Sequence, residues 1–181
     1  DTEVHPGWLT ALLRPFNDAD DVGAVGAKLV YPDGKLQEGG GIVFSDASGW
    51  NFGRTGDPDA PEVNFLREVD YCSAACLLVS KEVWDALGGF DERFVPAYYE
   101  DTDLAFALRD KGKRVLYQPA AVVTHFEGVS HGTDETQGMK AYQVQNQATF
   151  QNKWSKVLPN QQAPGSSPRR ASWRGAWPRV L

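Results

Sequence analysis

The chain has 181 residues, of which 41% are hydrophobic and 23% charged, and its formal net charge is −6. This is the length of one domain and the composition of an ordinary globular protein. The acidic balance argues against nucleic acid as the main partner, and no apolar stretch reaches the roughly 18 residues of a membrane helix or has the form of a signal peptide.

The cysteines and the methionine place limits on redox chemistry and on the ends of the chain. Cys72 and Cys76 lie in one apolar run at a spacing that fits neither a disulfide framework nor a CxxC metal or redox site. A reducing cytosolic setting agrees with this usage. The first residue is Asp1 and the single methionine is Met139, so we expect the chain to be cut from a longer protein.

Apolar periodicity predicts helices and short strands in alternation along the chain. The predicted helices cover residues 5–17, 81–87, 101–111 and 139–158. The predicted strands cover residues 23–31, 42–44, 68–80, 114–117 and 121–125, and the strand over 68–80 is expected to have a kink near Ser73. Strands mixed with helices of about ten residues indicate an α/β domain.

Three polar segments lie outside these elements. Residues 45–62 are long for a loop in a compact domain, and loops of that length are usually functional or disordered. Residues 126–138 are rich in glycine and are predicted to be a flexible loop. From Pro159 onward the composition shifts to Pro, Ser and Arg, which indicates a linker or a disordered tail. We therefore expect a domain over residues 1–158 and a tail over 159–181.

The strongest candidate site is the acidic start of the helix predicted at 101–111. Tyr98 and Tyr99 precede Glu100 and Asp101, and apolar residues three, four and seven positions further place Asp101 on the inward face. A carboxylate held there can act as a general base, because partial burial raises its pKa while the helix N-terminus favours its ionised form. The alternative is that these acids only cap the helix.

Three further candidates carry weaker patterns. Asp1 and Glu3 can hold a hard divalent cation, or they are two ordinary surface acids. His125 ends a predicted strand and can be a metal ligand or a surface loop residue. With His131 it does not form an HExxH pattern, so a zinc hydrolase is not supported. The aromatic residues between the glycines of 49–54 suit stacking on a sugar or plain loop packing.

Together these segments resemble the second, acceptor-side half of a family 2 glycosyltransferase of the GT-A type, with the greatest similarity to bacterial rhamnosyltransferase-like members. The resemblance covers about residues 1–158, and its motifs occur in the family's order. The matching stretches are DTEVHPGWL, GAVGAKLVYPDGKLQEGGGI, WNFGR, REVDYCSAACLLVSKEVWDALGGFDERF, YYEDTDLAFALRDKG, RVLYQPAAVVTHFEGVSHG and the helix over 140–154. It implies a Rossmann-like mixed sheet flanked by helices, present here as a partial domain without the nucleotide-binding half.

The resemblance also implies roles for individual residues. Asp1 matches the last acid of the Asp-x-Asp-type motif that holds Mg²⁺ or Mn²⁺ against the donor diphosphate; Glu3 belongs to the same patch, and His125 completes the metal site. Glu100 and Asp101 match the Glu-Asp motif of the acceptor site, with Asp101 as the general base. The implied donor- and acceptor-binding residues are Trp50, Asn51, Arg54, Tyr99, Ser130 and His131, the last two in a loop over 127–134 that closes on donor and metal.

The activity implied by the resemblance is inverting, metal-dependent transfer of a hexosyl-type group. The donor would be a UDP-, dTDP- or GDP-sugar, and the acceptor a glycan or lipid-linked glycan in polysaccharide biosynthesis. The family implies a cytoplasmic location, with peripheral association at the inner face of the membrane, and this half alone is expected to be inactive. Two alternatives stay open: a non-catalytic glycan-binding or scaffold module with a decayed transferase fold, and a hydrolase whose second carboxylate lies roughly 5 to 10 Å away.

Overall fold

A computed structural model describes residues 1–126 and 141–166. Its central strand is β2 (Val22–Val30), all nine residues of which are buried. β2 pairs in parallel with the long strand β8 (Arg114–His125), from Val22 opposite Arg114 to Val30 opposite Thr124. A strand covered on both faces requires a nearly continuous run of small and apolar residues, which the sequence of β2 supplies.

Short antiparallel strands extend this pair into a mixed sheet of six strands. Two of them pair with β2 and two with β8. They are β3 (Leu36–Glu38) and β7 (Leu77–Val79) beside β2, and β1 (Thr2–Val4) and β6 (Arg67–Glu68) beside β8. The sheet is therefore built from segments that are far apart in the sequence.

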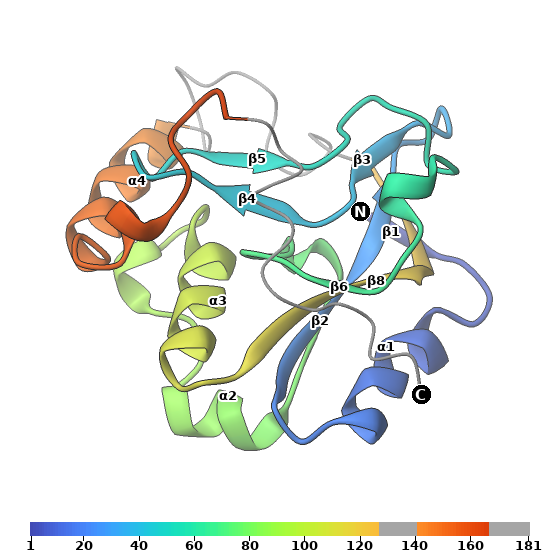
Figure 1. Cartoon of the computed structure of the whole chain (residues 1–181), viewed down its shortest axis with the longest axis horizontal. Helices are drawn as coiled ribbons and strands as arrows, with labels where there is room; N and C mark the ends of the chain where they lie inside the picture. Colours follow the sequence, from blue (N-terminus) through green and yellow to red (C-terminus); the bar gives the residue numbers. More distant parts are fainter. Residues whose placement is uncertain (127–140, 167–181) are drawn as a thin grey trace.

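A separate hairpin of β4 (Gly41–Val43) and β5 (Gly49–Asn51) stands apart from the sheet. It lies in the upper part of Figure 1, beside the last helix of the described chain. In the turn between β4 and β5, the backbone N–H of Ser45 donates to the carbonyl of Gln162 at 2.8 Å. Residues 167–181 lie outside the described part of the chain, so the boundary predicted at residue 158 stays a prediction.

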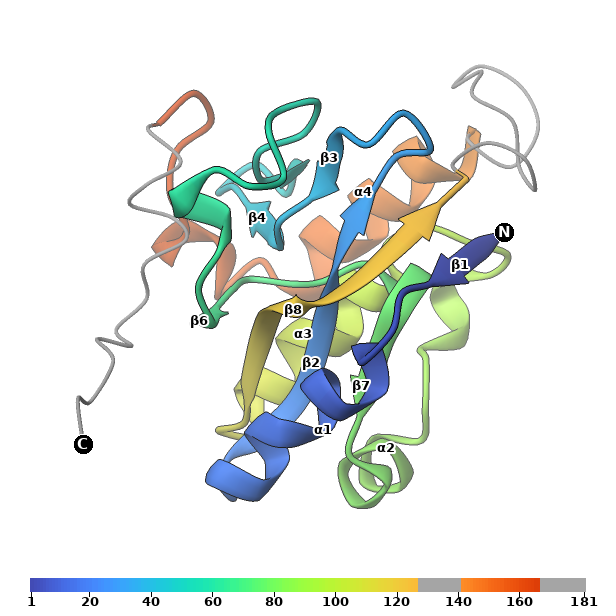
Figure 2. The ribbon, with the colours of Figure 1, turned by 90° about the vertical axis from the view of Figure 1, so that its right-hand side faces the viewer.

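Helices cover both faces of the sheet. α1 (Trp8–Asp18) packs on one face, while α3 (Glu100–Asp110) lies on the other and shares a buried cluster with α4 (Ala141–Lys153). Figure 2 shows α1 in front of the sheet and α3 behind it. Ala24 of β2 joins the α3 cluster and its neighbour Val25 joins the α1 cluster, because successive side chains of a strand point to opposite faces.

The close approach of two chain segments depends on a glycine of β2. A β-carbon added to Gly26 would lie 2.2 Å from the β-carbon of Cys72, so only a glycine permits this contact. Cys72 is consequently buried against the sheet, whereas Cys76 is only partly covered. Burial raises the pKa of both thiols.

The predicted helices are confirmed within a few residues at most of their ends. The remaining helix is α2 (Lys81–Leu87), which ends at Gly88 in the left-handed conformation. The long helix predicted over 139–158 is shorter than expected: α4 stops at Lys153 and a separate turn follows. The short 3₁₀ turns are η1 (Pro61–Val63), η2 (Ala74–Cys76), η3 (Glu92–Phe94) and η5 (Leu158–Asn160).

Two strand predictions need correction. The kinked strand predicted over 68–80 is not one strand: β6 ends at Glu68, the turn η2 begins after Ser73, where the kink was expected, and β7 follows. The two strands predicted around Pro119 form one strand, β8, with a register irregularity opposite the step from Ala27 to Lys28. Within residues 1–126 and 141–166, no helix combines the length and apolar character that a bilayer crossing requires.

Candidate active site

Asp101 lies in the first turn of α3 and is partly exposed. Its Oδ2 accepts a hydrogen bond from the backbone N–H of Ala74 at 3.1 Å, and its Oδ1 accepts from the N–H and hydroxyl of Thr102 at 2.6 and 3.2 Å. Burial raises the pKa of Asp101, while these donors act in the opposite direction. The carboxylate is thus fixed in orientation and binds a proton more readily than an ordinary aspartate, as a general base should.

Glu100 precedes Asp101 and titrates together with it. Burial and then the neighbouring Asp101 carboxylate raise the pKa of Glu100, since two adjacent carboxylates resist being ionised at once. The Oε2 atom of Glu100 is buried and has no hydrogen-bond partner among the described residues. Both carboxyls of the motif predicted from the sequence therefore lie at the helix N-terminus and bind a proton more readily than ordinary acidic side chains.

Tyr99 connects this helix start to the hairpin. Its hydroxyl donates to the carbonyl of Ala47 at 2.9 Å, in the turn between β4 and β5. Burial raises the pKa of Tyr99 to about 12, so the hydroxyl stays protonated and remains a donor. Tyr99 is therefore placed between the predicted base and the predicted acceptor loop, although its hydroxyl is already engaged by the backbone.

The acceptor-loop candidates lie on or just after β5. Trp50 is partly exposed, with its ring edge-on to Phe52 at a centroid separation of 5.9 Å. The Oδ1 atom of Asn51 accepts a hydrogen bond of 2.8 Å from the hydroxyl of Tyr71. The backbone N–H of Arg54 donates to the carbonyl of Asn51 at 3.2 Å, while its guanidinium carbon lies 5.9 Å from the ring centroid of Tyr31.

Asp1 and His125 are brought together by the pairing of β1 with β8. Thr2 is opposite His125, and the Oδ1 atom of Asp1 lies 3.6 Å from Nε2 of His125. On its other side the ring contacts Gln37, with 3.0 Å between Nδ1 and Oε1. An amide oxygen only accepts, so Nδ1 carries the proton in this contact and the lone pair of a neutral ring lies at Nε2, facing Asp1.

This pair fits a divalent cation as far as its donor set goes. A carboxylate oxygen and an imidazole nitrogen side by side suit Mn²⁺, and a carboxylate alone suits Mg²⁺. Two protein ligands also leave room for phosphate oxygens and water. Glu3 is exposed on β1 and does not complete the set: no three His, Cys, Asp or Glu side chains of the described chain converge closely enough to hold a metal ion.

The sequence of the chain is similar to segments of several known bacterial proteins. No profile of a known protein family matches the chain. It is 33% identical over 138 residues to the O-antigen biosynthesis protein RfbC of Myxococcus xanthus, a match to 72% of this chain and 10% of RfbC. It is 30% identical over 153 residues to the N-acetylglucosaminyl-diphospho-decaprenol L-rhamnosyltransferase of Mycobacterium tuberculosis, a match to 78% of this chain and 50% of that protein.

A solved glycosyltransferase structure has a similar fold. The crystal structure of GalNAc-T7 with UDP, GalNAc and Mn²⁺ superposes with a TM-score of 0.61 at 13% identity, over 87% of this chain and 31% of that one. The chain therefore has the fold of the GT-A glycosyltransferases, and its sequence is similar to segments of bacterial glycosyltransferases. This confirms the predicted family resemblance and the α/β GT-A fold. The chain spans half or less of the length of the relatives described above.

Two further residues of this candidate site were not predicted from the sequence, and both lie on β3. Gln37 orients His125, and the next residue, Glu38, accepts a hydrogen bond of 2.9 Å from the N–H of Ser73. Ser73 directly precedes Ala74, whose N–H binds Asp101. β3 therefore connects the predicted metal pair with the surroundings of the predicted base.

Glu38 is fully buried, and its Oε2 atom has no hydrogen-bond partner in the described chain. Burial raises the pKa of Glu38 to about 8, with a smaller contribution in the same direction from Asp101. The pattern that could have indicated Glu38 in the sequence is an acidic residue directly before three glycines. Ser130 and His131, which the resemblance implied as binding residues, lie outside the described residues.

Proposed function

We propose that this chain is the acceptor-side half of an inverting family 2 glycosyltransferase in which Asp101 is the general base. The observation that carries the proposal is the Asp101 carboxylate itself. It is held by Ala74 and Thr102, has a raised pKa, and stands at a helix start that Tyr99 ties to the hairpin bearing Trp50 and Asn51. A partly exposed, oriented carboxylate beside a candidate sugar-binding loop is the arrangement that acceptor activation requires.

The reaction then proceeds by one displacement. Asp101 takes the proton of an acceptor hydroxyl while that oxygen bonds to the anomeric carbon of the donor sugar. The bond to the nucleoside diphosphate breaks on the opposite side, and the configuration at the anomeric carbon inverts. Glu100 and Glu38 hold their protons more tightly than ordinary glutamates, which limits negative charge around Asp101.

Asp1 and His125 would hold a Mg²⁺ or Mn²⁺ ion on the donor side. When bound, such an ion supplies positive charge that stabilises a diphosphate leaving group. Gln37 keeps the imidazole oriented for this role. Glu3, Ser130 and His131 stay in the proposal as donor-side residues on the family resemblance alone.

The substrates follow from the relatives. The name of the mycobacterial relative describes a rhamnosyl transfer to a lipid-linked diphospho-sugar, and GalNAc-T7 was crystallised with UDP. We extend these to a nucleotide-sugar donor linked to UDP, dTDP or GDP and to a glycan or lipid-linked glycan acceptor. A cytoplasmic enzyme at the inner face of the membrane, acting in polysaccharide biosynthesis, agrees with such substrates.

The test is turnover by the full-length parent protein with Mg²⁺ or Mn²⁺ and a panel of UDP-, dTDP- and GDP-sugars. Asp101→Asn is expected to lower kcat by about 10²-fold or more, because the amide cannot accept the proton. Asp110→Asn makes the same chemical change at the exposed end of the same helix and should leave kcat unchanged.

Equal activity of the two variants would mean that Asp101 only caps the helix. Glycan binding without turnover of any donor would favour a non-catalytic module. Release of sugar from a simple glycoside, with no nucleotide-sugar present, would favour a hydrolase.

A further inference from the structure

Asn146 of α4 makes an unusual set of contacts with the segment that precedes α3. Its side chain is buried, and its Nδ2 atom donates to the backbone carbonyls of Phe94, Ala97 and Tyr98 at 2.9, 2.8 and 3.0 Å. An amide has two N–H bonds, so three acceptors share them. The side-chain Oδ1 atom is buried and has no hydrogen-bond partner among the described residues. The polar side chain therefore serves this one segment through its donors.

The segment held by Asn146 has a backbone that needs support. Tyr98 and Tyr99 both have positive φ, at 75° and 70°. Residues with a β-carbon avoid the left-handed region, and they stay there only where the surrounding structure holds them. Glu100 and Asp101 follow directly, so the direction in which α3 begins depends on this turn.

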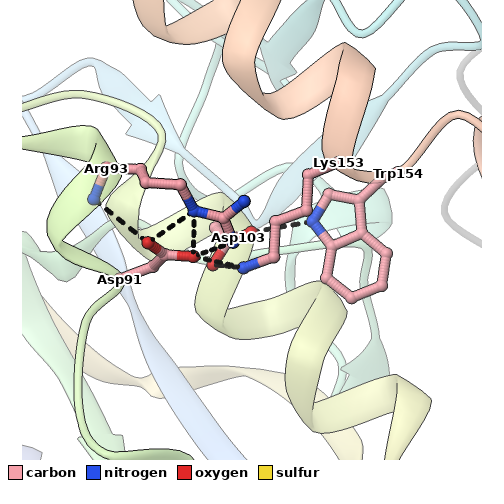
Figure 3. A network of polar contacts seen from close by, with 5 residues as sticks. All are labelled: Asp91, Arg93, Asp103, Lys153 and Trp154. Carbon is pink, nitrogen blue, oxygen red and sulfur yellow. Dashed lines mark hydrogen bonds and ion pairs between the residues drawn. The ribbon is translucent and has the colours of Figure 1, made fainter.

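Further contacts fix α4 against α3 on the same helix face. Phe150, four residues after Asn146, packs on the ring of Tyr99 with 5.3 Å between centroids. Figure 3 shows the next turn, where Lys153 and Trp154 both donate to the Asp103 carboxylate at 2.7 Å. Positions 146, 150, 153 and 154 follow the helical repeat. α4 thus presents one continuous face to the start of α3.

We propose that Asn146 is a positioning residue, which clamps the turn over Ala97 to Tyr99 and thereby sets the direction of Asp101 toward the acceptor. This inference rests on the proposed transferase function, because it assigns Asn146 a role in that reaction. An aspartate at this position has no N–H to donate and adds a buried charge facing three carbonyl oxygens. A shorter serine keeps one donor but cannot reach all three carbonyls.

The experiment uses the full-length parent protein and two readouts. Asn146→Asp is compared with Asn152→Asp, which makes the same change at an exposed position of the same helix. Hydrogen exchange of a peptide covering 97–104 reports the turn, since the amide of Asp103 donates to the carbonyl of Tyr99 at 2.8 Å. Steady-state kinetics with a nucleotide-sugar and acceptor report positioning of the base.

Asn146→Asp is expected to speed exchange in that peptide and to lower kcat by about 10- to 100-fold, with KM for the donor unchanged. Asn152→Asp should match the wild type in both. Asn146→Ser is the second variant if Asn146→Asp does not fold, and an intermediate loss of kcat is expected. Leu158→Val removes a buried methylene from the same cluster without touching the turn, so it should lower Tm and spare kcat.

Unchanged exchange over 97–104 in both Asn146 variants would overturn the proposal. So would a fall in kcat that Leu158→Val reproduces at an equal fall in Tm, since the effect would then be loss of stability alone. If the wild type turns over no nucleotide-sugar, the proposed function fails by itself. Faster exchange in Asn146→Asp would then still support the clamp on the turn, and unchanged exchange would overturn it.

Discussion

His125 shows how a single neighbour can determine the chemistry of a side chain. Gln37 engages Nδ1 and leaves Nε2 facing Asp1. Replacing Gln37 by leucine keeps most of the side-chain volume but frees the ring to rotate and to change tautomer. We expect the affinity of the full-length protein for Mn²⁺ to fall by about 10-fold or more.

Titration of free Mn²⁺ by electron paramagnetic resonance measures this affinity directly. Gln151→Leu makes the same change at an exposed position of α4 and serves as the control. Equal Mn²⁺ dissociation constants for the wild type and Gln37→Leu would show that the ring is oriented without Gln37.

Glu38 makes stability depend on pH. Because burial raises its pKa to about 8 in the folded protein, the folded state holds a proton that the unfolded chain releases near pH 4.5. The wild type therefore loses stability as pH rises from about 4.5 to about 8, at roughly 1.4 kcal/mol for each pH unit. Glu38→Gln has no proton to lose there, so it should gain Tm relative to the wild type across this range.

The measurement is Tm of both proteins at several pH values from 4 to 9. At pH 4 the two should differ least. A constant difference over the whole range would contradict a protonated Glu38. Below a pH of about 8 the buried Glu38 side chain is neutral in the folded protein. This explains why an acidic residue is tolerated at this buried position at neutral pH.

Individual residues of the candidate site could be predicted where neighbouring residues in the sequence form a recognisable motif. Glu100 and Asp101 stand out in the sequence, and so does His125 at the end of its strand. Gln37 and Asn146 do not, because each acts through a partner distant in the chain, 88 and 48 to 52 positions away. No local pattern encodes such a contact.

At the scale of elements, α3 and α4 are joined by a buried polar network (Figure 3). Lys153 donates to Asp91 and Asp103, and the indole N–H of Trp154 donates to the same Asp103. The Asp103 side chain is only 3% exposed and that of Lys153 is 21% exposed. Hydrogen bonds from the side chain of Arg93 and, to a smaller extent, from that of Lys153 lower the pKa of Asp91 far below its usual range.

Lys153→Met should destabilise the fold by about 3 kcal/mol, since it leaves the buried Asp103 without its cation. Lys81→Met is the matched control, because Lys81 pairs with Asp85 at the surface, where the side chains are 85% and 57% exposed. That change should cost less than about 1 kcal/mol. Urea unfolding of the two variants gives both values, and similar losses would mean that the network contributes no more than a surface pair.

The two errors in strand prediction have different physical origins. The stretch from 68 to 80 reads as one apolar strand, but the N–H groups of Ser73 and Ala74 donate to Glu38 and Asp101 instead of to a neighbouring strand. Polar partners from elsewhere in the fold thus replace the strand ladder. Around Pro119 the reverse holds: β8 continues past a residue that cannot donate, because an irregularity in register accommodates it.

At the scale of the whole molecule, the candidate groups gather where β2 and β8 end. His125 closes β8, and the chain leaving β2 returns as β3 with Gln37 and Glu38. Ligands of open α/β sheets bind beyond the carboxyl ends of parallel strands. The α/β class follows from alternating patterns in the sequence. The order of strands does not, since β8 pairs with β1, β2 and β6, all distant in sequence.

Because Cys72 packs against Gly26, the rate at which its thiol reacts reports how often the folded molecule opens. The Cys72 thiol can meet a reagent only when the sheet and the segment beside it separate, whereas Cys76 is only partly covered at the end of the turn η2. Alkylation followed by peptide mass spectrometry should therefore show rapid labelling of Cys76 and labelling of Cys72 only at the rate of global opening. Simultaneous labelling of both would mean that this region opens on its own. Otherwise the second, slower alkylation records how long each folded molecule survives, with no added dye or engineered label.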